Sequence, residues 1–406
     1  MTHAGPCLWT PLPQGPGSPS DRYKHACCSC DGHVYVLGGR ASGCLGDLWR
    51  YSVVCNEWAE LPCNGDAAPE ELEEHSMVAH EGLLYVFGGM LDSAYSKWRH
   101  PLWVFDVAKE KWVNWQRKPR PHQTRVPANR KGHSAVIMGS AMLVYGGFVD
   151  MKGSSQEFWS LDLGTMTWSL LSGGQQGTGS PGPRHSHSAV AHLGCMYLFG
   201  GLKGLREQRD MWRWSSTTSS WTSIRTWAGP PRLVGHSAVA YKDSMLLFGG
   251  GESQNSPKNC LWRYDFSTQS WGQVAFLPGS TPPEKIYHCC TGLGPSYRSG
   301  SVRPPKLADG RTRPFKNKCF PAPLTFLGSE GAIELQTLGP ARPPRDRTET
   351  CLTFENKAFR RQRDDELTDE DEDLICHLPD LLLVLGGRPS SAPGPISVWQ
   401  MTLTDS

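Results

Sequence analysis

Short apolar runs that end in a glycine pair recur along the chain and predict its buried strands. Each run is apolar at nearly every position, as expected for a strand that is covered on both faces. The two glycines that follow permit positive φ and a close approach of another backbone. The six runs are Val34–Gly39, Leu84–Gly89, Met142–Gly147, Met196–Gly201, Met245–Gly250 and Leu381–Gly387.

A hairpin with mixed polar and aromatic positions follows each of the first five runs and is marked by two tryptophans nine residues apart. In the first copy the pattern predicts a strand over Leu48–Val53, a turn at Cys55–Asn56 and a strand over Glu57–Leu61. Aromatic and β-branched residues favour such half-buried strands. The tryptophan pairs are Trp49/Trp58, Trp103/Trp112, Trp159/Trp168, Trp212/Trp221 and Trp262/Trp271.

A histidine precedes five of the glycine pairs, always thirteen residues before the first glycine, at His25, His75, His133, His187 and His236. The segment between them predicts two strands joined by a tight turn, as in His133–Ile137 and Met142–Tyr145. Each repeat of about 50 residues thus holds four strands, and this period is typical of propellers and solenoids. A lone four-stranded sheet cannot bury both faces, so we expect the repeats to stack around an axis.

The two ends of the sequence divide one repeat between them. Trp399 begins a sixth tryptophan pair but has no partner, whereas Cys7-Leu8-Trp9 reads like the second half of the hairpin. A linear array has no reason to split a repeat in this way, but a closed ring does. The pattern predicts that the N-terminal strand completes the last repeat.

The combined motif, four apolar residues and Gly-Gly followed by a Tyr or Phe and a Trp seven residues apart, resembles the kelch repeat. The later pairs are Tyr51/Trp58, Phe105/Trp112, Leu161/Trp168, Trp214/Trp221 and Tyr264/Trp271, of which two depart from Tyr or Phe. The resemblance covers residues 1–292 and 379–406. It implies an all-β, six-bladed propeller closed by the N-terminal strand, and it leaves function to the loops.

The sixth repeat is interrupted. His288 aligns with the other histidines, but its glycine pair begins ninety-eight rather than thirteen residues later, at Gly386. We therefore expect an insertion over residues 293–378, between the first two strands of the last blade. The insertion is rich in proline, basic at first and then acidic over Asp364–Asp373, which predicts disorder. Either it is a tolerated loop or it is a partner-binding arm. Thr368, which acidic residues follow, is a candidate phosphorylation site.

Net charge, the absence of long apolar runs and the cysteine content exclude several classes of protein. A net charge of +2 gives no general attraction to nucleic acid or membrane. The start lacks the apolar core of a signal peptide and no run of 18 apolar residues occurs, so we expect a cytoplasmic or nuclear protein that is not secreted. The 14 cysteines are then expected to be reduced structural thiols, and Cys28-x-Cys30 lacks the further ligands of a zinc site. No catalytic motif occurs and no cofactor or metal is expected.

Basic residues just before the aligned histidines are the candidate site. We expect them to gather at one mouth of the channel, where arginine can bind the carboxylates of an acidic peptide; the alternative is hydrogen bonding to carbonyls of the neighbouring blade. Exposed aromatic residues are not interleaved with them, which argues against nucleic acid. The residues are Arg22, Arg130, Arg184, Arg232 and Lys285, with Arg117, Lys118, Arg120, Arg125 and Arg206 from two basic loops. The second repeat departs from this rule, with Glu70–Glu74 at the same place.

The aligned histidines themselves are expected to join blades, with a ligand role as the alternative. Taken together, the residues and the resemblance predict a non-enzymatic protein-interaction module, a scaffold or peptide receptor that binds a partner on the channel face. The alternatives are a ubiquitin-ligase adaptor by analogy with other kelch proteins, a propeller enzyme, and a cytoskeletal or vesicle-trafficking adaptor. Kelch-like enzymes such as secreted copper oxidases need a Tyr/His copper cluster that we do not find in the sequence.

Overall fold

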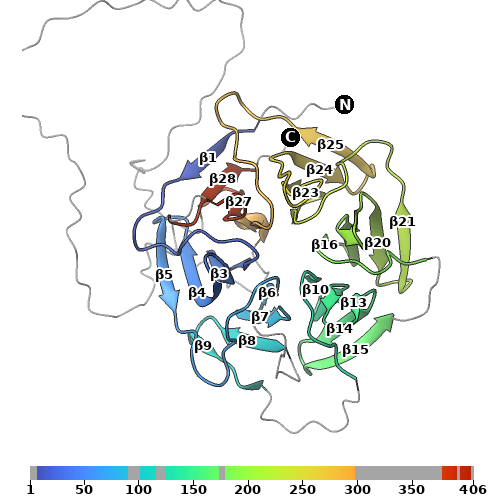
Figure 1. Ribbon diagram of the computed structural model, residues 1–406, viewed down its shortest axis with the longest axis horizontal. Helices are drawn as coiled ribbons and strands as arrows, with labels where there is room; N and C mark the ends of the chain where they lie inside the picture. Colours follow the sequence, from blue (N-terminus) through green and yellow to red (C-terminus); the bar gives the residue numbers. More distant parts are fainter. Residues whose placement is uncertain are drawn as a thin grey trace, which may run out of the picture. The chain divides into compact units, whose positions relative to one another are not determined.

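The computed structural model describes residues 7–89, 101–115, 125–172, 179–297, 377–390 and 394–403. Within these residues, six four-stranded antiparallel sheets follow one another around a ring (Figure 1). The inner strands of neighbouring blades lie side by side around the central channel. The predicted all-β, six-bladed propeller is confirmed.

The strands are given blade by blade, from the channel outward. Blade 1 holds β2 (Ala26–Cys30), β3 (His33–Arg40), β4 (Cys44–Ser52) and β5 (Glu57–Leu61); blade 2 holds β6 (Ser76–His80), β7 (Leu83–Phe87), β8 (Leu102–Asp106) and β9 (Lys111–Trp112). Blade 3 holds β10 (Ser134–Met138), β11 (Ala141–Tyr145), β14 (Phe158–Asp162) and β15 (Thr167–Ser172); blade 4 holds β16 (Ser188–His192), β17 (Cys195–Phe199), β20 (Met211–Ser215) and β21 (Ser220–Ile224). Blade 5 holds β22 (Ser237–Tyr241), β23 (Ser244–Phe248), β24 (Leu261–Asp265) and β25 (Ser270–Val274); blade 6 holds β26 (Cys289–Leu293), β27 (Leu381–Leu385), β28 (Val398–Thr402) and β1 (Trp9–Leu12).

The second strand of each blade is covered on both faces because it packs against the blades on either side. In the cluster between blades 1 and 6, Val34 and Val36 of β3 pack with Leu383 and Leu385 of β27, and all four are buried. Burial of apolar surface on both faces is why these strands read as unbroken apolar runs.

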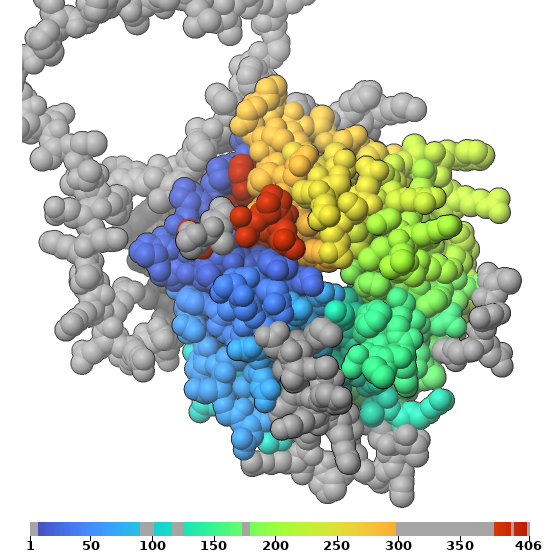
Figure 2. Space-filling view, viewed as in Figure 1, coloured from blue at the N-terminus to red at the C-terminus, as the bar shows by residue number. Residues whose placement is uncertain are grey.

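The N-terminal strand completes blade 6, as predicted. β1 pairs antiparallel with β28, with Trp9 opposite Met401 and Pro11 opposite Trp399. Trp9 is 1% exposed and its ring packs against Phe248, at a centroid distance of 5.3 Å. Figure 2 shows the first and last parts of the chain side by side where the ring closes. The closure therefore rests on a strand pairing and on a buried aromatic side chain.

A closed ring of six backbone hydrogen bonds surrounds the axis. The residue before each aligned histidine has a left-handed conformation, with φ between 54° and 64°. Its N–H donates to the carbonyl oxygen of the equivalent residue in the preceding blade, over 2.7–3.2 Å. The six residues are Lys24, Glu74, Gly132, Ser186, Gly235 and Tyr287. We call this the axial ring; each of its members positions one innermost strand.

The spacing between histidine and glycine pair has a packing explanation. The first glycine leaves room for the histidine of the next blade: a Cβ on Gly88 would lie 2.6 Å from Cε1 of His133. The second leaves room for the histidine of its own blade: a Cβ on Gly89 would lie 2.9 Å from Cβ of His75. The Gly89 N–H also donates to the Arg130 carbonyl, over 2.8 Å. Histidine and glycine pair together couple each blade to the next.

The interruption lies in blade 6, within the hairpin of its first two strands. β26 runs through Leu293, a short 3-10 helix η2 (Pro295–Tyr297) follows, and β27 begins at Leu381. Most of the predicted insertion, 298–376, lies outside the described residues, as does the candidate phosphorylation site Thr368.

Candidate functional site: the channel face

One face of the propeller carries the loops that connect consecutive blades and the loops that follow the glycine pairs; we call it the channel face. The aligned histidines lie just below it and are buried. Burial lowers the pKa of His75, His133 and His288 to about 3 and that of His236 to about 4. Some of the rings bond to the preceding blade: His133 Nε2 lies 2.8 Å from Ser76 Oγ, His187 Nε2 lies 2.9 Å from Ser134 Oγ, and His236 Nε2 lies 3.2 Å from the Phe199 carbonyl oxygen. Among the described residues, no group of three or more His, Cys, Asp or Glu side chains could hold a metal ion.

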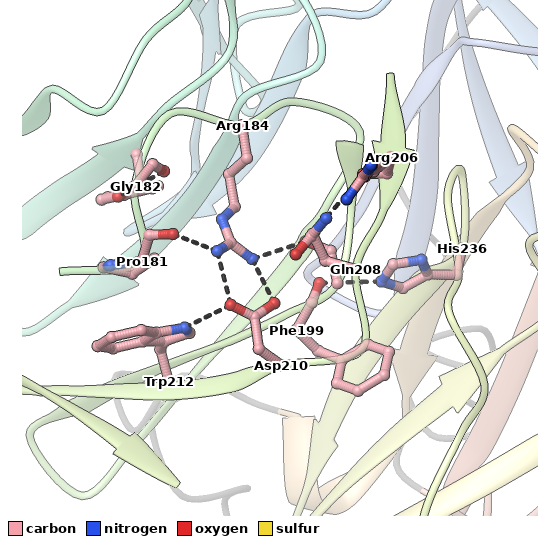
Figure 3. Close-up of polar contacts among 11 residues, drawn as sticks. Pro181, Gly182, Arg184, Phe199, Arg206, Gln208, Asp210, Trp212 and His236 are labelled. Carbon is pink, nitrogen blue, oxygen red and sulfur yellow. Dashed lines mark hydrogen bonds and ion pairs between the residues drawn. The ribbon is translucent and has the colours of Figure 1, made fainter. Parts of the chain in front are cut away.

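The arginines three residues before the histidines are also buried. Arg184 is 1% exposed, and its guanidinium contacts both Asp210 carboxylate oxygens, at 2.8 and 2.7 Å (Figure 3). It also donates to the Gly200 carbonyl, over 2.9 Å, and to the Pro181 carbonyl. Trp212 Nε1 donates to the same carboxylate, over 2.7 Å. Arginine, acid and tryptophan form one connected group, which we call the Arg–acid–Trp group.

The same group occurs in blades 1 and 3. Its members there are Arg22, Asp47 and Trp49, and Arg130, Glu157 and Trp159. In blades 2 and 5, Leu72 and Leu233 replace the arginine, and Pro101 and Cys260 stand where the acid would be. Arginine and acid are therefore present or absent together. This co-occurrence identifies the arginines as members of internal pairs.

The charge of each arginine is compensated within its own blade. Burial alone would raise the pKa of Asp210, but the Arg184 guanidinium and the Trp212 N–H outweigh it, so that this pKa lies below its usual value. Lys285 is 5% exposed and donates to the Pro389 carbonyl, over 2.7 Å. Arg22, Arg130, Arg184 and Lys285 thus offer little surface to a partner.

A group of exposed basic residues on this face lies on blade 4 and on its connection to blade 5. Leu205 and Trp227, at 97% and 102% relative exposure, stand among them. The hairpin of β18 (Leu202–Lys203) and β19 (Arg206–Glu207) carries one part of the surface, and residues 225–232 carry the other. We call this surface the blade-4 crest: Lys203, Leu205, Arg206, Arg209, Arg225, Trp227 and Arg232, all exposed.

Backbone contacts hold the two parts of the crest together. Gln208 and Leu233 form an antiparallel bridge, which brings Arg209 beside Arg232. Gly229 lies against the Trp271 ring, so closely that a Cβ there would meet Cδ1 at 2.7 Å. Within the described part of the chain, no ion pair engages the five basic side chains of the crest. The crest is a fixed surface of uncompensated positive charge.

A groove of the opposite charge lies at the edge of blade 1 and its connection to blade 2. Its volume is about 1030 Å³, and its lining includes the exposed carboxylates of Glu60, Glu70 and Glu71. In a ring of six blades, the connection between blades 1 and 2 is diametrically opposite the connection between blades 4 and 5. The channel face therefore has an acidic side and a basic side.

Comparison with known proteins agrees with the repeat pattern. The family model for the KLHDC2/KLHL20/DRC7 Kelch-repeats domain matches residues 5–125 and 74–297. The chain belongs to the kelch-repeat family.

Relatives of this kelch chain differ widely in size. Host cell factor 2 of Homo sapiens is 26% identical over 77% of the chain, which spans 42% of that protein. Kelch domain-containing protein 3 of Homo sapiens is 28% identical over 67% of the chain and 75% of its own length. Leucine-zipper-like transcriptional regulator 1 homolog of Drosophila melanogaster is 25% identical over 74% of the chain, which spans 31% of it. The chain thus spans less than half of two of these three relatives.

The predicted site residues of the kelch propeller fall into three sets. Arg125, Arg206 and Arg232 are exposed on the channel face. Arg22, Arg130, Arg184 and Lys285 are buried and bonded, as described above. Arg117, Lys118 and Arg120 lie outside the described residues. In the part of the chain that the structure covers, no helix is long and apolar enough to cross a membrane.

Sequence reasoning missed the acids and the exposed apolar residues. An acidic residue stands two positions before the first tryptophan in the same three repeats that carry the arginine, and this joint occurrence was readable. Trp227 was also detectable, because it falls outside the nine-residue tryptophan spacing.

Removing one partner of the Arg–acid–Trp group should destabilise the kelch propeller. We expect Arg184→Leu to lower the free energy of unfolding by about 2–3 kcal/mol, since Asp210 then keeps a partly buried charge without its partner. The double variant Arg184→Leu/Asp210→Cys copies blade 5 and should recover at least half of that loss. Urea unfolding measures both values; equal destabilisation of the single and double variants would contradict the coupling.

Proposed function

We propose that this kelch propeller is a non-enzymatic interaction module that binds an acidic segment of a partner protein on the blade-4 crest. Membership of the kelch family supports a role in protein–protein interaction, because propellers of this family are mainly interaction modules. The observation that carries the proposal is a fully exposed Trp227 among uncompensated arginines.

Exposing the apolar ring of a tryptophan to water is unfavourable, and burying it in an interface lowers the free energy of binding. Tryptophan and arginine are enriched among residues that dominate binding energy, while surrounding contacts contribute little. Arginine binds carboxylates through two parallel hydrogen bonds. Leu205 and Trp227 would anchor apolar side chains of the partner, and Arg206, Arg209 and Arg232 would bind its carboxylates. A short acidic segment with one or two large apolar residues fits this surface.

The histidines beneath the channel face support a binding role more than a catalytic one. The lowered pKa values of His75, His133, His236 and His288 keep these four rings neutral near pH 7, and the rings pack against the glycine pairs. General acid–base catalysis needs a group that titrates near the working pH and reaches the substrate. A role as scaffold, ligase adaptor or trafficking adaptor, and a cytoplasmic or nuclear location, remain predictions within this proposal.

Selection from a random peptide library displayed on phage tests the proposal. The purified propeller should enrich sequences with several Asp or Glu residues around a large apolar residue. Affinity for a selected peptide should fall at least about tenfold in Trp227→Ala and in Arg206→Glu/Arg232→Glu, as for loss of one interface anchor. Because these side chains are exposed, the melting temperature should stay within a few degrees of the wild-type value.

Matched control variants lie at the opposite ends of the strands. Leu193→Ala removes an exposed apolar side chain from the turn after β16, and Lys111→Glu reverses an exposed charge at the start of β9. Both should bind the selected peptide normally. Enrichment of neutral or basic sequences, or undiminished binding by the crest variants, would count against the proposal.

A further inference from the structure

The inner strands that meet where the ring closes carry an unusual number of cysteines. β2 of blade 1 contains Cys27, Cys28 and Cys30, and β26 of blade 6 contains Cys289 and Cys290. Cα atoms of the two strands approach within 8 Å of one another. A disulfide requires a Cα separation below about 7 Å and side chains that point toward each other.

The repeat geometry shows where Cys289 points. In other blades the residue directly after the aligned histidine reaches toward the next blade: Ser76 Oγ lies 2.8 Å from His133 Nε2, and Ser237 Oγ accepts the Cys290 N–H over 2.9 Å. Cys289 has this position in blade 6. Its thiol donates to the His25 carbonyl, with 2.9 Å between sulfur and oxygen. The side chain therefore points into the first strand of blade 1.

Cys27 approaches from the other side of the same junction. It packs with Leu383 and Leu385 of blade 6, and the nearby Cys289 thiol, together with burial, raises the pKa of Cys27. Cys290 is directed away, since it packs with Trp9 and Tyr241 on the side of blade 5. Cys27 and Cys289 both keep some exposure to solvent. The two sulfurs thus face each other across the blade 1–blade 6 junction.

We propose that Cys27 and Cys289 form an oxidative modification site, at which a hydroperoxide converts the two thiols to a disulfide. The peroxide first transfers one oxygen atom to a thiol sulfur, which becomes a sulfenic acid while the peroxide is reduced to water or an alcohol. The second thiol then attacks that sulfur, the S–S bond forms, and the hydroxyl leaves as water. Two thiols lose two electrons and two hydrogens in total, and a dithiol reductant reverses the step.

A disulfide between Cys27 and Cys289 would stabilise the closed ring because it would join the first and last blades. The ring is closed by the pairing of β1 with β28, and when that pairing opens, blades 1 and 6 can separate. A disulfide between their inner strands would hold the junction closed. Because it would constrain a long stretch of unfolded chain, it should raise the melting temperature by several degrees. This inference does not depend on the proposed function.

Treatment with hydrogen peroxide, followed by alkylation of the remaining thiols in denaturant and non-reducing peptide mapping, tests the site. We expect a cross-linked peptide containing Cys27 and Cys289, lighter by about 2 Da than the two reduced peptides together. The melting temperature should rise by several degrees and return to its starting value after dithiothreitol.

Three variants separate this site from general thiol oxidation. Cys27→Ser and Cys289→Ser should lose both the cross-link and the rise in melting temperature, whereas Cys290→Ser on the same strand should keep both. If a serine variant fails to fold, the wild-type peptide map still decides. Oxidation of other cysteines with no Cys27–Cys289 peptide, or a cross-link that lowers the melting temperature, overturns the proposal.

Discussion

Lowering the pH from 7 to 5 should remove most of the propeller's stability, because four of its buried histidines accept protons far more readily in the unfolded chain than in the folded protein. In the unfolded chain a histidine has a pKa of about 6.5. In the folded protein burial lowers the pKa of His75, His133 and His288 to about 3 and that of His236 to about 4. Stabilisation is therefore complete above pH 6.5 and is lost as the pH falls toward the folded values.

The expected loss is large. Well below pH 6.5, each of these four histidines contributes about 1.4 kcal/mol of destabilisation per pH unit, so the total reaches roughly 7 kcal/mol by pH 5. This is comparable to the whole stability of an ordinary domain. Circular dichroism at a series of pH values should show cooperative unfolding with a midpoint between about 4.5 and 5.5, with uptake of roughly four protons.

The acids of the Arg–acid–Trp groups provide the internal comparison. Although burial opposes it, the arginines and tryptophans lower the pKa of Asp47, Glu157 and Asp210. Their stabilisation is present above the unfolded pKa of about 4 and is lost only below it. A propeller that unfolds only below pH 4 would show that carboxylates alone determine its acid stability, and the argument from the histidines would fail.

Deleting residues 1–12 should lower the melting temperature by about 10 °C or more, and some of the protein should aggregate. The deletion removes β1, exposes the hydrogen-bonding edge of β28 and leaves the site of the buried Trp9 ring empty. Loss of a buried tryptophan alone costs about 3–5 kcal/mol, and an exposed strand edge promotes association. Differential scanning calorimetry and light scattering measure the two effects.

Two further proteins make this test specific. Deletion of residues 1–6 keeps Trp9–Leu12 and should leave the melting temperature nearly unchanged. Trp9→Ala keeps the strand but loses the ring, and should fall between the two deletions. An unchanged melting temperature after removal of residues 1–12 would show that the ring does not need its N-terminal strand.

The blades could be predicted because each one packs between two neighbouring blades and therefore needs the same pattern of buried residues. A second strand covered on both faces must be apolar throughout, and a histidine packed on glycine fixes a spacing that recurs in the first five blades. His133 and the Gly146–Gly147 pair, for example, already locate β10 and β11 to within a residue at each end. The closure could be predicted because Trp9 and Trp399 each lack their partner, and β1 and β28 supply one to the other.

The sequence could not show in the same way which basic residues are buried in internal ion pairs and which are exposed for binding. The sequence alone left Arg184 as either a binding residue or a structural one, because its partner Asp210 lies 26 residues away in another loop. Whether a charge is compensated depends on how two loops meet. The joint occurrence of arginine and acid in three repeats hints at a pair, but the spacing alone does not show that the two loops bring the side chains together. The axial ring also left little trace, since backbone groups form it and its members range from glycine to tyrosine.

The acidic groove beside Glu70 and the blade-4 crest on the other side give the channel face an electric dipole that lies in its plane. A mobile acidic chain that diffuses toward this face is repelled at one edge and attracted at the other, so it is rotated before any contact forms. Such steering raises the association rate and weakens as salt screens charges beyond about 10 Å. Two propellers that approach face to face would likewise favour one relative rotation, with the crest of each over the groove of the other.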